Sequence, residues 1–204
     1  MATRLNAAAR RDVIERAATE VFAQRGYEGA SMDEIARRSG VTVPVVYDHF
    51  ESKQALHRRL LERHFAELRA IWREHTARDV PLERRLEQAV DAWLAYVESH
   101  PFAWRMLFRD TTGDPEVQAA HREVAAQSRD LLLPLLAAQL PVTDVAMTWE
   151  VLRAVLQGLA LWWLEHPDVP REQVLATIMN TLWIGLERVL AGESWLPGES
   201  GAAL

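Results

Sequence analysis

The chain has 204 residues, no cysteine and a formal net charge of −6 at pH 7. This length allows one or two domains with a substantial core, and the lack of cysteine excludes disulfides, thiolate nucleophiles and cysteine-ligated metals. No apolar run approaches the roughly 18 residues of a membrane span, and the N-terminal residues lack the apolar segment of a signal peptide. We therefore expect a cytoplasmic protein with no membrane partner.

The charge is divided unevenly along the chain. Residues 1–60 contain ten Lys and Arg against eight Asp and Glu, a balance of +2, whereas residues 61–204 contain thirteen against twenty-one, a balance of −8. Only the N-terminal part is therefore suited to a polyanion, and the larger acidic part is expected to stay away from it.

Apolar residues at steps of three and four predict a first helix over residues 8–25, which Gly26 ends. Ser31 and Glu34 then form a capping box, S-x-x-E, in which each side chain bonds the other residue's amide. This box starts a second short helix, and Gly40 ends it because glycine adopts the left-handed conformation at little cost. The tight turn predicts that another helix follows at a steep angle.

Thr42 is expected to cap that next helix, with Pro44 in its first turn, where a missing amide hydrogen costs nothing. Ser52 is expected to cap a long fourth helix that runs to about His75. Two helices that cross through a glycine turn form the helix-turn-helix arrangement, which places its second helix in the major groove of DNA. Residues 31–53 therefore predict a DNA-binding element.

Further helices are predicted over residues 81–99, 102–108, 115–141, 144–165 and 171–191, separated by proline and glycine. No sustained alternation of period two indicates a strand. The predicted class is all-α with about nine helices. We divide it into an N-terminal arm (1–8), a helix-turn-helix domain (9–55), a ligand-binding and dimerisation domain (56–192) and a loose C-terminal tail (193–204).

Three ordered motifs carry a family resemblance. They are Ala18-x2-Val21-Phe22-x3-Gly26-Tyr27, Ser31-x3-Ile35-Ala36-x3-Gly40-Val41 and Val46-Tyr47-x-His49-Phe50-x2-Lys53-x2-Leu56. With this spacing the N-terminal part resembles the TetR family of bacterial transcriptional regulators. The resemblance implies a homodimer, commonly a repressor that leaves its operator DNA when a small molecule enters the C-terminal domain.

The resemblance also implies roles for individual residues. Helix caps at Ser31 and Thr42 and the matching positions Tyr47 and Lys53 are expected to contact phosphate. Positions expected to face the bases are Val43, Pro44, Val45 and His49. Each has a simpler interpretation: the hydroxyls as caps alone, the tyrosine as core and the histidine as solvated.

The predicted recognition helix departs from the family pattern because positions 43–46 are Val-Pro-Val-Val, followed by the acidic Asp48. Valine methyl groups can contact a thymine methyl group, but they cannot make the bidentate bonds that distinguish purines. Our hypothesis is that direct readout is weak and that DNA shape contributes more. The arginines expected to support binding are Arg37 and Arg38, together with an arm that contains Arg4, Arg10 and Arg11.

The last two helices each carry an apolar stripe wide enough to face both a core and a partner. A helix-turn-helix protein usually reads two half-sites about 34–36 Å apart, which favours a homodimer over pure core. The predicted interface residues are Leu152, Leu156, Leu159, Trp163, Ile178, Leu182 and Leu186. We expect a four-helix bundle formed by two chains.

Eight tryptophans are a high number for 204 residues, and several lie on different predicted helices of the C-terminal domain. Such rings line apolar ligand cavities that contain a few polar groups, although they occur more often in cores. The predicted ligand-binding residues are Trp72, Trp93, Trp104, Phe108, His121, Trp149, Arg153 and Gln157. A small, largely apolar effector near Trp72 would act through the long fourth helix on the spacing of the DNA-binding domains.

The sequence contains no signature of an enzyme. No H-x3-H, H-E-x-x-H or E-x-x-H pattern, phosphate-binding loop, dinucleotide fingerprint or nucleophile elbow occurs. We therefore predict no catalytic residues, metal or cofactor. The alternative function is a helical carrier or sensor of hydrophobic small molecules that has lost DNA binding, which the valine-rich recognition helix supports.

Overall fold

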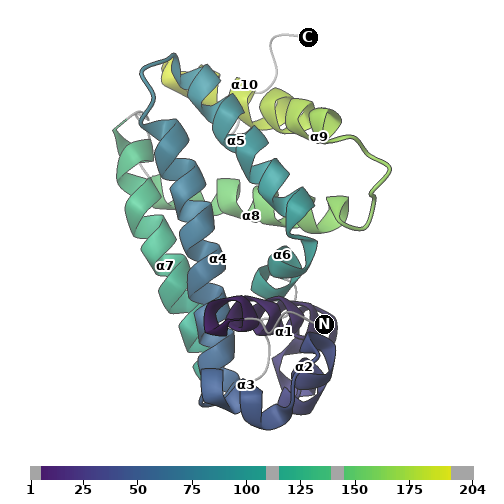
Figure 1. Ribbon diagram of the computed structural model, residues 1–204. Helices are drawn as coiled ribbons and strands as arrows, with labels where there is room; N and C mark the ends of the chain where they lie inside the picture. Colours follow the sequence, from purple (N-terminus) through teal and green to yellow (C-terminus); the bar gives the residue numbers. More distant parts are fainter. Residues whose placement is uncertain (1–5, 109–114, 139–144, 194–204) are drawn as a thin grey trace. The chain divides into compact units, whose positions relative to one another are not determined.

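The computed structural model describes residues 6–108, 115–138 and 145–193, and these contain helices and no strand. The helices are α1 (Ala7–Gly29), α2 (Met32–Ser39), α3 (Val43–His49), α4 (Lys53–Thr76), α5 (Leu82–Ser99), α6 (Pro101–Phe108), α7 (Pro115–Ala137), α8 (Val145–Trp163), α9 (Arg171–Ile178), the π-helix η1 (Met179–Trp183) and α10 (Ile184–Leu190) (Figure 1). Because α9, η1 and α10 are contiguous, the described part holds nine helical rods. The predicted all-α class is confirmed.

Two compact units form from these helices. Unit 1 comprises residues 1–71 and 95–128, and unit 2 comprises residues 72–94 and 129–204. Unit 1 thus contains the whole predicted helix-turn-helix domain together with α6 and parts of α4, α5 and α7. No helix in the described ranges is long and apolar enough to cross a membrane.

The helices of unit 1 pack around a shared apolar core. Helix α1 packs against α2 and α6 through an apolar face, and α2 packs against α3. Fully buried aliphatic residues from α1, α2, α3, α4 and α6 fill the space between these helices. They are Ile14, Val21, Ile35, Val46, Leu56, Leu60, Leu61 and Leu107.

Unit 2 contains α8 and the rod formed by α9, η1 and α10, with parts of α4, α5 and α7. Trp93, Leu94, Trp163, Val174 and Ile178 are buried in it. The π-helix was not predicted, because an i→i+5 turn adds a single residue to a helix and leaves no distinct pattern in apolar periodicity. The predicted tail and the end of the 115–141 helix extend into residues outside the described ranges.

Candidate nucleic-acid interface

Local chemistry fixes the turn between α2 and α3. The Glu34 amide donates to Ser31 Oγ at 3.2 Å, which confirms the predicted cap of α2. The Glu34 carboxylate lies within ion-pair distance of Arg25, Arg37 and Arg38. Gly40 ends the helix with φ 67°. A side chain there would meet nothing within 4 Å, so glycine is needed for the backbone conformation and not for a close helix crossing.

The start of α3 differs from the prediction. Thr42 occupies the N-cap position, but its hydroxyl makes no capping hydrogen bond, so the predicted side-chain cap is wrong. The backbone still closes the first turn, since the Val46 amide donates to the Thr42 carbonyl at 3.2 Å. Pro44 lies in this first turn as expected, where its fixed φ favours the helix.

The helix α3 presents a face with few polar groups. Thr42, Pro44 and Tyr47 are exposed, with half of the Tyr47 side chain accessible, and Asp48 is exposed beside them. Val43, Val45 and His49 are half-buried, so they are partly accessible to a partner. Because Val46 is fully buried, it belongs to the core. The face is therefore apolar and aromatic, with one acidic group.

The two predicted arginines of α2 have different surroundings. The Arg37 side chain is 77% exposed, and its ion pair with Glu34 is long, at 3.9 Å. Arg38 instead donates to Gln24 at 2.6 Å and lies 3.5 Å from Glu20, both on α1. Arg38 thus joins α2 to α1, whereas Arg37 is free to reach a phosphate.

Lys53 has a structural role that the sequence pattern did not indicate. Its Nζ donates to the carbonyl oxygens of Tyr27 at 2.8 Å and Ala30 at 3.1 Å, and lies 4.3 Å from the centre of the Tyr27 ring. Gly26 interrupts α1 at φ 69°, so these carbonyl groups follow the break. Since an ammonium group has three N–H donors, one remains for the predicted phosphate contact.

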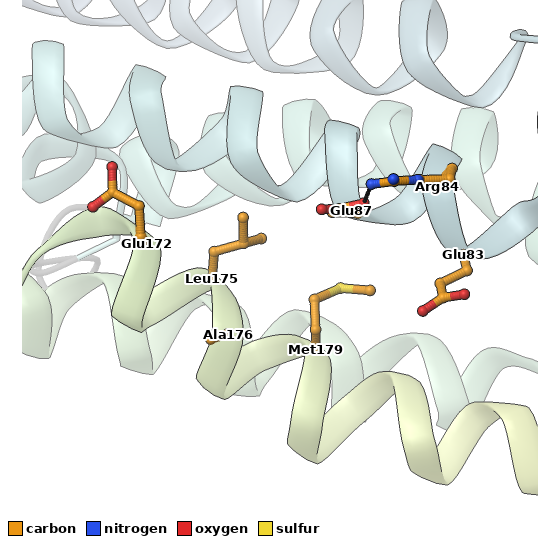
Figure 2. A pocket seen from close by; sticks show the side chains of 7 residues that line it. All are labelled: Glu83, Arg84, Glu87, Glu172, Leu175, Ala176 and Met179. Atoms are coloured by element: carbon orange, nitrogen blue, oxygen red, sulfur yellow. Dashed lines mark hydrogen bonds and ion pairs between the residues drawn. The ribbon is translucent and has the colours of Figure 1, made fainter.

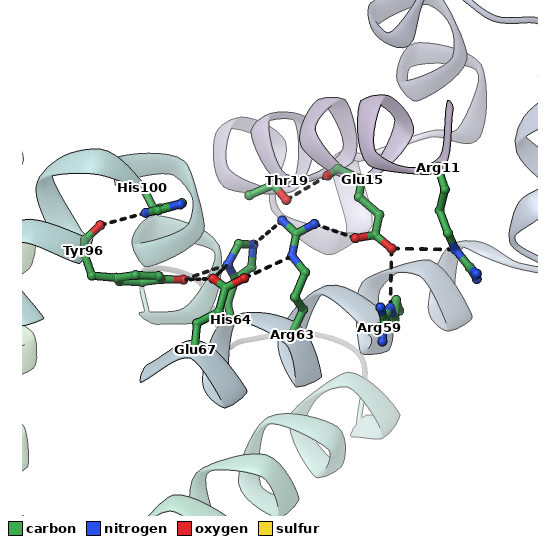
Figure 3. Close-up of polar contacts among 9 residues, drawn as sticks. All are labelled: Arg11, Glu15, Thr19, Arg59, Arg63, His64, Glu67, Tyr96 and His100. Atoms are coloured by element: carbon green, nitrogen blue, oxygen red, sulfur yellow. Dashed lines mark hydrogen bonds and ion pairs between the residues drawn. The ribbon is translucent and has the colours of Figure 1, made fainter. Parts of the chain in front are cut away.

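A buried carboxylate, Glu15, joins α1 to α4. It is only 2% exposed and lies 3.8 Å from Arg11, 3.4 Å from Arg59 and 2.5 Å from Arg63 (Figure 3). A buried charge is tolerated when ion pairs and hydrogen bonds compensate it. The arginines Arg10 and Arg11, predicted to lie on an arm, belong to α1, and Arg4 lies outside the described residues.

The same polar network continues along α4 to the end of α5. Arg63 donates to His64 Nε2 at 3.3 Å, so Nδ1 carries the proton that faces Tyr96 at 2.7 Å. Tyr96 in turn donates to Glu67 at 3.1 Å. The hydrogen bond from His64 lowers the pKa of Glu67, and burial raises the pKa of Tyr96. In the sequence, only the i,i+4 spacing of Arg59, Arg63 and Glu67 indicates this polar network.

Two buried histidines lie in unit 1 away from this network. The rings of His57 on α4 and His121 on α7 are 5.5 Å apart, and His57 also packs edge-on against Phe22 and Tyr27. Burial, followed by the charges of His121 and Lys53, lowers the pKa of His57 to about 3. Burial also lowers the pKa of His121, which was predicted to bind a ligand.

The predicted ligand residues are divided between the two units. In unit 1, Trp104 is buried, and its ring centre lies 4.3 Å from that of Phe108 in a tilted arrangement. The Phe108 ring also meets the Phe65 ring edge-on at 5.8 Å between centres, so these rings build a core cluster. In unit 2, Trp93 is buried, whereas Trp72 and Trp149 are half-buried. Arg153 pairs with Glu150 and donates to Gln157 at 2.6 Å.

Unit 2 contains an open cavity of about 460 Å³ between α5 and the α9–η1 segment (Figure 2). Its lining is amphipathic, and none of the predicted ligand residues belongs to it. The lining residues are Glu83, Arg84, Glu87, Glu172, Leu175, Ala176 and Met179. In the described ranges, no group of three or more His, Cys, Asp or Glu could hold a metal ion.

The predicted dimer residues also have mixed surroundings. Trp163 and Ile178 are buried within unit 2, and Trp163 Nε1 donates to the Val169 carbonyl at 2.8 Å. The monomer therefore already covers these two of the seven predicted interface residues. The predicted leucines remain half-buried; they are Leu152, Leu156, Leu159, Leu182 and Leu186.

Within unit 1, a capped α2, a left-handed glycine turn and an α3 with an exposed face define a helix-turn-helix DNA-binding protein. Residues 14–60 match the family model of bacterial regulatory proteins, tetR family, and residues 82–185 match that of a tetracyclin repressor-like C-terminal domain. The chain belongs to the TetR family of transcriptional regulators, which bind DNA.

Several known proteins are similar over most of this chain. The HTH-type transcriptional activator FasR of Mycolicibacterium smegmatis is 31% identical over 184 residues, which cover 88% of this chain and 84% of FasR. A TetR-like regulator from Rhodococcus shares the fold with a TM-score of 0.75 at 23% identity, covering 93% of this chain and all of that one. FadR of Bacillus subtilis, solved with stearoyl-CoA, has a TM-score of 0.72 at 16% identity, and the match covers 90% of this chain and 99% of FadR.

Proposed function

We propose that this protein is a homodimeric transcriptional repressor that a small, largely apolar ligand releases from its operator DNA in the cytoplasm. The proposed dimer is supported by a row of exposed apolar side chains on one face of α8. Met147, Val151, Val155 and Trp162 follow one another at steps of four, four and seven residues, which is the spacing of a single helix face.

Two glycines on α8 and α10 would permit a close helix contact with a partner. Gly158 lies on α8 and Gly185 on α10, and a side chain at either position would meet no atom of the described chain within 4 Å. Ile184, next to Gly185, is also exposed. The exposed apolar face of α8 marks an interaction site. A second copy is the proposed occupant, with the half-buried leucines of α8 and α10 at the edges.

The long helix α4 supports a mechanical route for ligand control. It runs without a break from Lys53, directly after the helix-turn-helix, to Thr76, and its first part packs in unit 1. A ligand changes DNA affinity only if it prefers one conformation over another. A hundredfold preference for the conformation that does not bind DNA corresponds to about 2.7 kcal/mol.

The ligand class is inferred from chemistry and from a structural relative. FadR of Bacillus subtilis was solved with stearoyl-CoA, whose acyl chain is long and apolar. Stearoyl-CoA is therefore the first probe, with free coenzyme A as the control for its polar part. A loss of DNA affinity with stearoyl-CoA but not with coenzyme A supports an apolar effector; equal effects of both would contradict it.

The decisive experiment measures binding of the purified protein to the DNA that flanks its own gene, by fluorescence anisotropy at low salt. Specific binding supports the proposal, and a reporter gene then gives the sign: deletion of the regulator raises expression for a repressor and lowers it for an activator, the activity that names FasR. The alternative, a hydrophobic-ligand carrier without DNA binding, is favoured by the apolar face of α3 and by Asp48. It predicts ligand binding and no DNA binding under any of these conditions.

A further inference from the structure

The arginines around Glu15 leave two guanidinium groups only partly used. Arg11 and Arg59 both approach the Glu15 carboxylate through Nε, at 3.8 Å and 3.4 Å. Their terminal amino groups point away from the carboxylate (Figure 3). Among the described residues, no hydrogen bond or ion pair engages those terminal groups. About half of each side chain is exposed, at 49% and 51%.

We propose that Arg11 and Arg59 form a phosphate-binding site on unit 1, held in position by the buried Glu15. The Arg59 Nε donates a hydrogen bond to Glu15, and the Arg11 Nε forms an ion pair with it. Both contacts restrict the guanidinium groups, so these can bind an anion at a smaller entropic cost. Its terminal N–H groups present the planar geometry that matches phosphate oxygens. Two such groups from α1 and α4 therefore converge on a single anion better than flexible surface arginines do.

The local charge favours an anion. Three arginines surround Glu15, and among them only Arg63 also lies within ion-pair distance of Glu67, at 3.8 Å. Arg63 is also the least exposed of the three arginines, so its positive charge compensates the buried Glu15 carboxylate. The positive charge that remains uncompensated is carried by the exposed ends of Arg11 and Arg59.

The position of Arg11 indicates the source of the phosphate. Its guanidinium carbon lies 5.0 Å from the centre of the Phe50 ring, and Phe50 is the C-cap residue of α3. Arg11 is thus adjacent to the end of the helix expected in the major groove, where the DNA backbone borders the groove. A backbone phosphate is the favoured ligand; a free phosphate compound would use the same chemistry. The choice of DNA rests on the proposed function.

The test compares the salt dependence of DNA binding for Arg11→Gln, Arg59→Gln and a matched control, Arg58→Gln. Arg58 lies on the same helix and is 50% exposed, but its guanidinium group already pairs with Glu62 and Glu123. Loss of one phosphate contact lowers the slope of log K against log salt by about 0.9 per bound protomer. We expect this decrease, with about tenfold weaker binding, for Arg11→Gln and Arg59→Gln and not for Arg58→Gln.

A second measurement separates the two phosphate sources. Inorganic pyrophosphate is titrated into the full-length protein and its variants by calorimetry in the absence of DNA. Pyrophosphate binding that Arg11→Gln and Arg59→Gln abolish, with an unchanged DNA slope, would assign the site to a free phosphate compound. Unchanged slopes and no pyrophosphate binding would overturn the site, as would equal effects of Arg58→Gln. Failure of the wild type to bind DNA would instead refute the proposed function, and the calorimetry would still test the site.

Discussion

Lys53 donates a hydrogen bond from Nζ to the carbonyl oxygen of Tyr27 at 2.8 Å, and the same ammonium group lies over the Tyr27 ring. The only lysine of the chain thus holds the end of α1 against the start of α4. The position that the family resemblance assigns to phosphate is therefore also part of the framework of unit 1. A substitution there affects both folding and DNA binding, and the two effects need separate measurements.

We expect Lys53→Met to lower the free energy of unfolding by about 1–2 kcal/mol, because two partly buried carbonyl groups lose a charged donor. Urea denaturation monitored by circular dichroism measures this change. Arg37→Met removes the same charge from an exposed side chain with one long ion pair, so we expect a change of at most about 0.5 kcal/mol. Equal stability of Lys53→Met and wild type would contradict a structural role for the ammonium group.

The neighbouring arginines of α2 should separate binding from stability. Arg38 bonds Gln24 and lies near Glu20 on α1, so Arg38→Gln should destabilise unit 1 by about 1 kcal/mol. Arg37→Gln should leave the denaturation midpoint unchanged and lower the salt slope of DNA binding by about 0.9 per protomer. Thermal melts and anisotropy titrations on the same preparations give both values. The prediction fails if the two variants exchange these effects.

Burial of His57 should make folding sensitive to acid. Its pKa is lowered to about 3 in the folded protein, whereas an unfolded chain protonates histidine near its ordinary value of 6.5. The unfolded state therefore binds more protons between these values, and stability present above pH 6.5 is lost as the pH falls toward 3. The maximum slope from one such group is about 1.4 kcal/mol per pH unit.

The variant His57→Gln removes that titration. We expect its free energy of unfolding to fall less steeply than that of the wild type between pH 6 and about 4.5, whatever its stability at pH 7. Urea titrations at a series of pH values provide the slopes. His121→Gln should act in the same direction, because burial lowers the pKa of His121 as well. A wild-type slope in both variants would show that these two histidines do not control acid stability.

The parts of the interface that were predictable are those that local chemistry determines. Ser31 caps its helix and Gly40 ends it through interactions within a few residues, so their spacing carried enough information. Thr42 also carries a hydroxyl group at an N-cap position, but this hydroxyl makes no capping hydrogen bond. Sequence spacing does not fix the orientation of the hydroxyl group. The helix-turn-helix was therefore predicted correctly, whereas one of its caps was not.

Contacts between distant segments were not predictable. Glu15 meets Arg59 and Arg63 across 44 and 48 residues, and only the packing of α1 on α4 brings them together. Apolar periodicity similarly identifies a stripe without showing which side faces the core. Trp163 and Val151 both fit such stripes on α8, but Trp163 is buried and Val151 is exposed. This distinction needs the positions of the neighbouring helices.

The exposed side of α8 leads to a direct test of the proposed dimer. Val151 lies in the middle of that apolar face, so Val151→Glu would place two like charges in a dry interface. We expect the variant to be monomeric at micromolar concentration by analytical ultracentrifugation while its helix content stays unchanged. Ala146→Glu is the matched control, because Ala146 is exposed on another face of the same helix. Dimers of Val151→Glu as stable as those of the wild type would locate the interface elsewhere.

The apolar surface of α3 allows a test of how this protein reads DNA. Val43 and Val45 are half-buried and carry only methyl groups, so their possible base contacts are limited to thymine methyl groups. If these contacts specify sequence, replacing both residues by alanine should reduce the preference for thymine-containing operator positions by about 1 kcal/mol per contact. Selection of binding sites from a random DNA library, before and after substitution, measures this preference. Arg37→Gln is the comparison, because loss of a phosphate contact should weaken all sequences alike. An unchanged preference in the double variant would assign sequence recognition to DNA shape and to groups other than these valines.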